Sequence, residues 1–204
     1  NESIVTVDGT GAAGTSVGTY TSLVLDANGF PVISYRDSTN TNLKLAHCND
    51  VNCAGNNESI QTVDGAGGFN VGQYNSLALD ASGFPVISYQ DGGTLDLKLV
   101  HCNDANCAGI NESIVTVVST GAVGQYTSLK LYNGNPVISY YDINDATNLD
   151  PSATGNLKLV RCDDPNCAGG NDVPQLLDGA TTDVGQYTSL ALDAGKAVVS
   201  YRAN

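Results

Sequence analysis

Short segments in which apolar and polar residues alternate run along the whole chain, and none shows a sustained helical period. Residues 76–80 read Ser-Leu-Ala-Leu-Asp and residues 95–99 read Leu-Asp-Leu-Lys-Leu, so each segment would turn one face to a core. Residues 85–88, Pro-Val-Ile-Ser, are more uniformly apolar, as expected for a strand that is covered on both faces. Gly, Asn, Asp and Pro bound these segments. The pattern predicts an all-β protein with almost no helix.

One unit recurs along the chain. Val17-Gly-Thr-Tyr-Thr-Ser-Leu23 returns at 71–77, 123–129 and 184–190, at intervals of 54, 52 and 61 residues. Each unit holds four strand-like segments, which we call a, b, c and d in chain order. Four strands in roughly 50 residues is the size of a β-propeller blade. An open array of blades is the alternative. An open β-solenoid fits less well, because its coils take about 20–30 residues and have fewer strands per turn.

The repeats divide the chain into a single repeat domain over residues 1–204. Its expected parts are a d strand, three complete blades and a half blade, at residues 2–8, 17–64, 71–118, 123–178 and 184–202. The order of strands is therefore d, then abcd three times, then ab.

The repeated string Tyr-Thr-Ser-Leu-x-Leu-Asp-x-x-Gly-x-Pro-Val-Ile-Ser-Tyr-x-Asp, followed by Leu-Lys-Leu, resembles a family of bacterial and archaeal extracellular β-propeller repeats. The resemblance covers nearly the whole chain. It implies a propeller fold and an extracellular or cell-surface location. It implies no single activity, because function resides in sites rather than in folds.

Incomplete sheets at both ends would leave unpaired strand edges, which recruit other strands. The expected assembly edges are Glu2, Ile4, Val5, Val7, Ala197, Val199 and Tyr201. Three outcomes follow: two chains close a ring, successive chains join end to end into a filament, or the chain is a fragment of a longer array.

The six cysteines form three C-x4-C pairs, one at each c–d turn. The pairs are Cys48 with Cys53, Cys102 with Cys107, and Cys162 with Cys167. Disulfides within each pair are expected, which indicates an oxidising compartment. Zinc is the rival, but pairs on separate blades would not meet. His47 and His101 precede a cysteine, whereas the third repeat has Arg161 there, which argues against a metal.

Two motifs of enzymes occur by chance in the same stretch. Residues 9–14 fit G-x-G-x-x-G, but a strand rather than a helix follows, so dinucleotide binding is rejected. Residues 14–18 fit G-x-S-x-G around Ser16 without a strand–turn–helix elbow, and Asn70 replaces the serine in the next repeat. The aspartates of the chain recur from repeat to repeat, whereas a catalytic site normally occurs in one repeat alone. No catalytic residues are therefore predicted.

An insertion in the third repeat, residues 142–155, breaks the symmetry. It offers hard oxygen ligands suited to calcium at Asp142, Asn144, Asp145 and Asp150. Their spacing does not fit an EF-hand, and a solvated acidic loop is the favoured interpretation. No cofactor is therefore expected, and calcium is the alternative.

Tyrosines begin each a strand and end each b strand. They are Tyr20, Tyr74, Tyr126 and Tyr187 in the first set, and Tyr35, Tyr89, Tyr140 and Tyr201 in the second. Packing between blades is favoured over stacking on sugar rings, because the chain has no tryptophan. Asn1, Asn57 and Asn111 begin N-x-S sequons and would carry glycans in a suitable host.

Charge narrows the range of partners. A net charge of −13 and a pI near 4.1 argue against nucleic acid and against anionic lipid. No apolar run reaches the roughly 18 residues that span a bilayer, so membrane insertion is not expected. Methionine is absent even at position 1, which suggests a processed chain.

The sequence thus predicts a secreted, non-enzymatic structural or interaction protein that associates with itself, joining head to tail into filaments through incomplete terminal blades. The alternatives are a carbohydrate-binding, lectin-like propeller and a fragment of a larger surface adhesin. Glycans and other surface proteins are the further partners considered.

Overall fold

The computed structural model describes residues 4–9, 15–66, 69–109, 111–143, 154–179 and 182–204. Every secondary-structure element within these residues is a β-strand, which confirms the all-β class. Within the same residues, no helix has the length and apolarity needed to cross a membrane.

The strands form three four-stranded antiparallel sheets and one two-stranded sheet, which we call blades 1 to 4. Blade 1 comprises β1 (Val17–Leu25), β2 (Pro31–Asp37), β3 (Asn42–His47) and β4 (Ser59–Asp64). Blade 2 comprises β5 (Gln73–Leu79), β6 (Pro85–Asp91), β7 (Asp96–His101) and β8 (Ser113–Val118). Blade 3 comprises β9 (Ala122–Tyr132), β10 (Asn135–Ile143), β11 (Gly155–Arg161) and β12 (Gln175–Asp178), and blade 4 comprises β13 (Val184–Asp193) and β14 (Lys196–Ala203).

Tight turns join the first two strands of blades 1 and 2. The Asp80 carboxylate accepts hydrogen bonds from the N–H groups of Ser82 (2.7 Å) and Phe84 (2.9 Å), and Gly83 adopts a φ of +82°. Asp26 and Gly29 repeat this arrangement in blade 1. An aspartate that bonds the turn backbone and a glycine with positive φ together fix a short hairpin connection.

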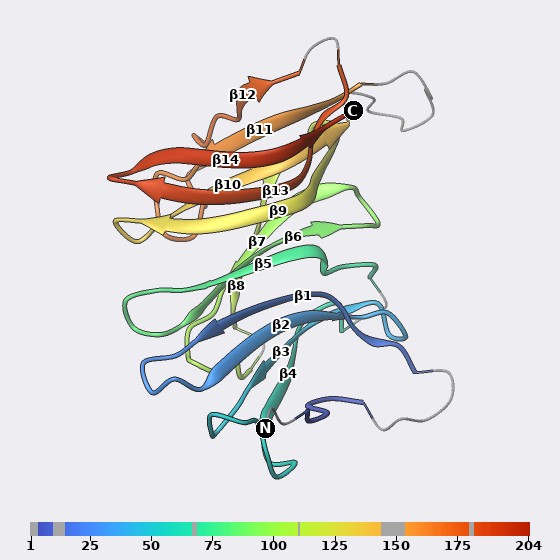
Figure 1. Ribbon diagram of the computed structural model, residues 1–204, viewed down its shortest axis with the longest axis vertical. Helices are drawn as coiled ribbons and strands as arrows, with labels where there is room; N and C mark the ends of the chain where they lie inside the picture. The colour runs from blue at the N-terminus through green and yellow to red at the C-terminus, as the bar shows by residue number, and fades with distance from the viewer. Residues whose placement is uncertain (1–3, 10–14, 67–68, 110, 144–153, 180–181) are drawn as a thin grey trace.

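The blades stack face to face along the long axis of the molecule (Figure 1), and the core lies between them. Val32 of blade 1 packs in one buried cluster with Leu77 of blade 2. The equivalent pairs are Val86 with Leu129 and Val137 with Leu190. Each blade therefore buries its apolar side chains against the next blade rather than in one central core.

The strand expected over residues 2–8 is not formed where the structure describes that segment, since residues 4–9 carry no strand. β4, the equivalent strand of the next repeat, pairs with β3, the third strand of its own sheet. Residues 4–9 precede blade 1, and none of the described strands pairs with them. Asp8 still anchors the segment, because it pairs with Lys44 (2.5 Å) and accepts a hydrogen bond from Tyr35.

Replacing repeat-equivalent leucines tests whether the core lies between blades. Leu129→Ala removes a side chain that is 1% exposed, and we expect it to lower the free energy of unfolding by about 2–5 kcal/mol. Leu23→Ala alters the equivalent residue of blade 1, which is 57% exposed, and we expect a change of about 0.5 kcal/mol or less. Urea denaturation of dilute protein, followed by circular dichroism, measures both, and equal losses would contradict this account of the core.

Candidate functional site

A β-bulge interrupts the first strand of every blade at a tyrosine. We call these strands, β1, β5, β9 and β13, the inner strands. The pairing register shifts between Thr19 and Ser22 in blade 1 and at the equivalent place in the other blades. The bulge tyrosines are Tyr20, Tyr74, Tyr126 and Tyr187, with φ of 53°, 51°, 52° and 54°. A left-handed backbone is unusual for an aromatic residue, so its recurrence in every blade marks it as a built feature.

The bulge turns the tyrosine carbonyl toward the next blade. Thr127 Oγ1 donates to the Tyr74 carbonyl (2.7 Å), and Thr188 Oγ1 donates to the Tyr126 carbonyl (2.8 Å). At the first junction the Asn75 side-chain amide donates to the Tyr20 carbonyl. In blades 2, 3 and 4, the residue after the tyrosine thus ties its own blade to the preceding one.

Buried and partly buried serines complete each junction. Ser88 Oγ donates to Thr127 Oγ1 (3.0 Å), and Ser139 is linked to Thr188 in the same way (2.9 Å). Ser76 Oγ accepts a hydrogen bond from the Leu129 N–H (3.0 Å). Because buried polar groups cost free energy when they are left without partners, these bonds fix how adjacent blades are aligned.

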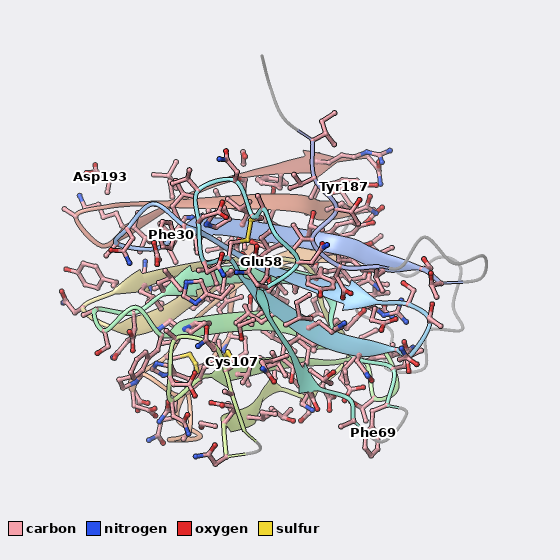
Figure 2. All side chains as sticks on the ribbon, turned by 90° about the horizontal axis from the view of Figure 1, so that it is seen from below. Phe30, Glu58, Phe69, Cys107, Tyr187 and Asp193 are labelled. Carbon is pink, nitrogen blue, oxygen red and sulfur yellow. A yellow bond between two sulfur atoms is a disulfide. The ribbon has the colours of Figure 1, made fainter. Side chains whose placement is uncertain are left out.

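The tyrosine rings form a continuous row across the four blades. Their centroids are 4.6 Å apart from Tyr20 to Tyr74, 4.7 Å from Tyr74 to Tyr126 and 4.4 Å from Tyr126 to Tyr187. The two end rings belong to exposed residues, Tyr20 being 40% and Tyr187 60% exposed. In Figure 2, Tyr187 is labelled in the upper part of the view and Cys107 below it.

Beside the row lies an open groove of about 310 Å³, which we call the tyrosine groove. It is lined by the four tyrosines and by the residue that follows each of them, namely Tyr20, Thr21, Tyr74, Asn75, Tyr126, Thr127, Tyr187 and Thr188. These lining residues include no carboxylate, imidazole or thiol. The groove therefore offers aromatic surface and neutral hydrogen-bonding groups.

The central phenols of the groove stay protonated at neutral pH. Burial is the main cause that raises the pKa of Tyr74 above its ordinary value of 10.0, and the neighbouring tyrosines add to it. Burial likewise raises the pKa of Tyr126. At the edge of the row, burial and a hydrogen bond to Asp183 (2.7 Å) raise the pKa of Tyr141 to about 12. Neutral phenols both donate and accept hydrogen bonds.

All six cysteines form the expected disulfides, Cys48–Cys53, Cys102–Cys107 and Cys162–Cys167. Each joins Cα atoms 5.0 Å apart. No thiolate is left for zinc, because all the cysteine sulfurs are bonded. Cys102 and Cys107 belong to the buried cluster between blades 1 and 2, so this disulfide also packs against the preceding blade.

The histidines before the cysteines connect one blade to the next. His101 Nδ1 lies 3.1 Å from the Pro165 carbonyl in the disulfide loop of blade 3, and its Nε2 lies 3.1 Å from Asp80. His47 makes the same contacts with Ala105 (2.9 Å) and Asp26 (3.3 Å). Arg161, at the third position, donates to the Gly195 carbonyl of blade 4 (2.9 Å). These contacts give the three residues a structural role.

The tyrosines at the ends of the b strands pack between blades. Tyr35, Tyr89 and Tyr140 are buried, and Tyr35 and Tyr89 donate to Asp8 (2.5 Å) and Asp64 (2.6 Å). The more exposed Tyr201 donates to Asp178 (2.5 Å). Asp64 and Asp178 end the fourth strands β4 and β12 of the preceding blades, and Asp8 lies in the equivalent segment before blade 1.

The structure places only part of the insertion in blade 3. Asp142 is buried, 2% exposed, and pairs with Lys158, so one of its carboxylate oxygens is already engaged. The other calcium candidates, Asn144, Asp145 and Asp150, lie outside the described residues. The calcium hypothesis stays a prediction.

The remaining expected sites lie at the surface. Asn57 and Asn111 are exposed, as glycan acceptors must be, whereas Asn1 lies outside the described residues. Of the proposed assembly edges, Ile4 is 99% exposed and Val5 is 41% exposed, and Glu2 is outside the described residues. Val7, Ala197 and Val199 are partly covered.

The sequence analysis did not find the tyrosine groove, because it favoured packing between blades over sugar stacking for the bulge tyrosines. Hydrogen-bonding residues follow the tyrosines in every repeat, as in Tyr126-Thr-Ser128. That recurrence was the available signal for the groove. However, the alternation of apolar and polar residues does not reveal a β-bulge. The bulge turns both the carbonyl and the ring away from their regular strand positions.

Comparison with solved structures identifies the architecture. The chain is similar to an α-L-arabinofuranosidase from Fusarium graminearum, with a TM-score of 0.59 and 12% identity, over 92% of this chain and 62% of that one. It is similar to an α-L-arabinanase from Cellvibrio cellulosa, with a TM-score of 0.54 and 14% identity, over 90% of this chain and 67% of that one. An apocarotenoid oxygenase from Synechocystis gives a TM-score of 0.55 and 10% identity, over 98% and 53% of the two chains.

These similarities confirm the predicted array of propeller-type blades, and at such low identity they establish the fold alone. No family model and no curated protein matches the sequence. The chain spans about 62% of the length of the arabinofuranosidase.

The expected function needs correction. We expected a non-enzymatic structural protein that assembles into filaments, whereas the neighbours include propeller hydrolases that act on carbohydrates. The expectation rested on unpaired edges at the ends of the chain. Unpaired edges show only where a sheet lacks a further strand. They give no information about what the inner strands bind.

Removal of one hydroxyl tests the contact between blades. Thr127→Val keeps the shape of the side chain but leaves the Tyr74 carbonyl and Ser88 without their partner, so we expect a loss of about 1–3 kcal/mol in unfolding free energy. Thr21→Val in blade 1 is the matched control, because Thr21 is exposed and no described blade precedes it. Urea denaturation measures both variants, and a neutral Thr127→Val would overturn the role given to this hydroxyl.

The Asp80 carboxylate makes stability depend on pH. Burial opposes its ionisation, but hydrogen bonds from Phe84, His101 and Ser82 outweigh burial and lower its pKa below 3.8. A lowered folded-state pKa contributes stability above the unfolded pKa, and this contribution disappears as pH falls through the folded pKa.

We therefore expect the stability difference between wild type and Asp80→Asn to be largest above about pH 4 and to shrink at lower pH. Urea denaturation between about pH 2 and pH 6 measures it. Asp193→Asn changes the exposed equivalent in blade 4 and serves as the control. A difference that stays constant across this range would contradict the assignment.

Proposed function

We propose that this chain binds carbohydrate through the tyrosine groove. The observation that carries the proposal is the row of four tyrosines, each followed by a hydrogen-bonding side chain, along the inner strands. A sugar ring has an apolar face of C–H groups and a rim of hydroxyls. Tyrosine suits such a ligand because it combines an aromatic face with a polar tip.

The charge of the protein narrows the class of carbohydrate. The chain carries a net charge of −13, and the residues that line the groove contain no basic side chain. A sulfated or uronic-acid glycan would be repelled by this field and would meet no cation. The ligand we propose is therefore a neutral oligosaccharide.

Repetition supports a ligand of several sugar units. Equivalent groups recur at every blade, and the tyrosine centroids are 4.4–4.7 Å apart. Contacts spread over several blades suit an extended chain better than a single sugar. Arabinohexaose, which is bound in the structure of the similar arabinanase, belongs to the same chemical class of neutral sugars.

The same proposal places the protein outside the cell. Three disulfides fit an oxidising compartment, and the sequons at Asn57 and Asn111 are exposed. Neutral polysaccharides occur outside the cell. The resemblance to extracellular propeller repeats supports the same location.

Isothermal titration calorimetry with arabinohexaose and cellohexaose tests the proposal. We expect saturable binding by the wild type, and at least a tenfold loss, about 1.4 kcal/mol, for Tyr187→Ala. Tyr187 is 60% exposed, so its removal should leave the fold intact. Tyr132→Ala removes another exposed tyrosine, outside the groove, and should change affinity less than twofold.

Product analysis by chromatography accompanies the titration, because the similar structures include hydrolases. Binding without cleavage supports a recognition surface. Cleavage that Tyr187→Ala abolishes would make the groove an active site instead. Failure of wild type to bind any neutral oligosaccharide on a glycan array would refute the proposal.

A further inference from the structure

Tyrosine is the side chain of this protein that is most open to oxidation by single electrons. Methionine, tryptophan and free thiols are the usual competitors, and the sequence contains no methionine and no tryptophan. All six cysteines are already joined in disulfides, so no thiol competes. An oxidising equivalent that reaches the protein therefore falls on the phenol rings.

Four of these phenols, at Tyr20, Tyr74, Tyr126 and Tyr187, form the row described above, which we call the tyrosine row. All four line the open tyrosine groove of about 310 Å³, and the central Tyr74 and Tyr126 are partly exposed. The groove therefore gives a small oxidant access to the row along its whole length. By contrast, Tyr89 and Tyr140 at the ends of the b strands are fully buried.

Neighbouring rings of the tyrosine row are close enough to react with each other. Their centroids are 4.4–4.7 Å apart, and their planes are inclined by 47–57°, so that one edge of each ring tilts toward the next. A phenol that loses an electron and a proton carries its unpaired electron partly on the ring carbons ortho to the oxygen. Two such carbons that touch can form a bond.

We propose that the tyrosine row is a site of oxidative cross-linking, in which neighbouring tyrosines become dityrosine and join adjacent blades by a carbon–carbon bond. The oxidant is hydrogen peroxide acting through a haem peroxidase, which takes one electron and one proton from each of two phenols. The two radicals bond at their ortho carbons. Each of these carbons then releases its hydrogen as a proton, and the phenol oxygen takes up a proton. Two tyrosines and one hydrogen peroxide thus give one dityrosine and two waters.

This bond would supply a kind of link that the disulfides do not. Each disulfide joins cysteines only 5 residues apart, in one turn of one blade. A bond from Tyr126 to Tyr187 would close a loop of 61 residues (187 − 126) between blades 3 and 4. Closing a long loop restricts the unfolded chain and so stabilises the fold. The inference uses no carbohydrate and stands whether or not the groove binds one.

Contact within the tyrosine row makes the reaction intramolecular. Rings that are held together react at a far higher effective concentration than rings on separate molecules in dilute solution. We therefore expect the yield of dityrosine per chain to stay constant when the protein is diluted about tenfold.

Mass spectrometry of the intact chain after treatment with a haem peroxidase and hydrogen peroxide tests the proposal. We expect a single chain that has lost two hydrogen atoms for each link. Trypsin places the four tyrosines of the row on four different peptides, residues 1–36, 45–98, 99–130 and 162–196. The last two contain one tyrosine each, so their joined product identifies the bond between Tyr126 and Tyr187.

Two conservative variants separate position in the row from exposure. Tyr187→Phe keeps the ring but removes the phenol, and we expect it to abolish the product that joins 99–130 to 162–196. Links of peptide 45–98 with its neighbours in the row should persist. Tyr132→Phe is the matched control, because Tyr132 is 42% exposed but belongs to none of the ring pairs among the described residues. Its links within the row should be unchanged.

Oxidation that joins only separate chains would overturn the inference, because the bond would then form between molecules. Links from Tyr132 that are as abundant as those within the row would overturn it too, since exposure alone would then decide the product. Bonds between tyrosines that are not neighbours in the row, or loss of tyrosine without any link, would have the same consequence.

Discussion

The hydrogen bond between a bulge tyrosine carbonyl and the next blade is the contact on which the rest of the structure depends. Tyr74 and Tyr126 offer their carbonyls to Thr127 and Thr188, and the bulge provides the required direction. A left-handed tyrosine costs of order 1–3 kcal/mol of backbone strain. The bonds and the apolar packing at each junction offset this cost. The same bulge brings the rings into one row, so a single local distortion both aligns the blades and forms the groove.

Much of the fold could be predicted because it depends on short-range patterns. Alternation, turn residues such as Asp80 and Gly83, and the recurring cysteines are all visible in the sequence. The prediction of a strand at residues 2–8 was wrong for the residues that the structure describes. A suitable sequence pattern forms a strand only when a neighbouring strand pairs with it. The groove was missed for a related reason. Tyr20 and Tyr187 are far apart in the chain, and only the bulges and the stacking of blades bring their row together.

The chemistry of the groove follows from what repetition permits. A position that recurs in each blade contributes the same kind of group each time, so the surface is uniform along its length. The lining residues are neutral, although the chain as a whole is strongly acidic. Acidic groups instead hold the scaffold, as Asp64 does by accepting from Tyr89 and pairing with Lys98 (3.1 Å). Charge keeps the surface soluble while the inner strands stay free for contacts with uncharged ligands.

Because each blade shares its core with its immediate neighbours, the molecule is mechanically closer to a stack than to a sphere. Stability in such a stack is approximately a sum of blade terms and junction terms, as in a one-dimensional lattice. Blade 2 is held by two junctions, whereas blade 4 has two strands and one junction within the chain. Thermal opening would therefore start at β13 and β14 and travel inward. The disulfide loops of blades 2 and 3 contact His47 and His101 of the preceding blades. These contacts would slow the spread of unfolding from blade 4 towards blade 1.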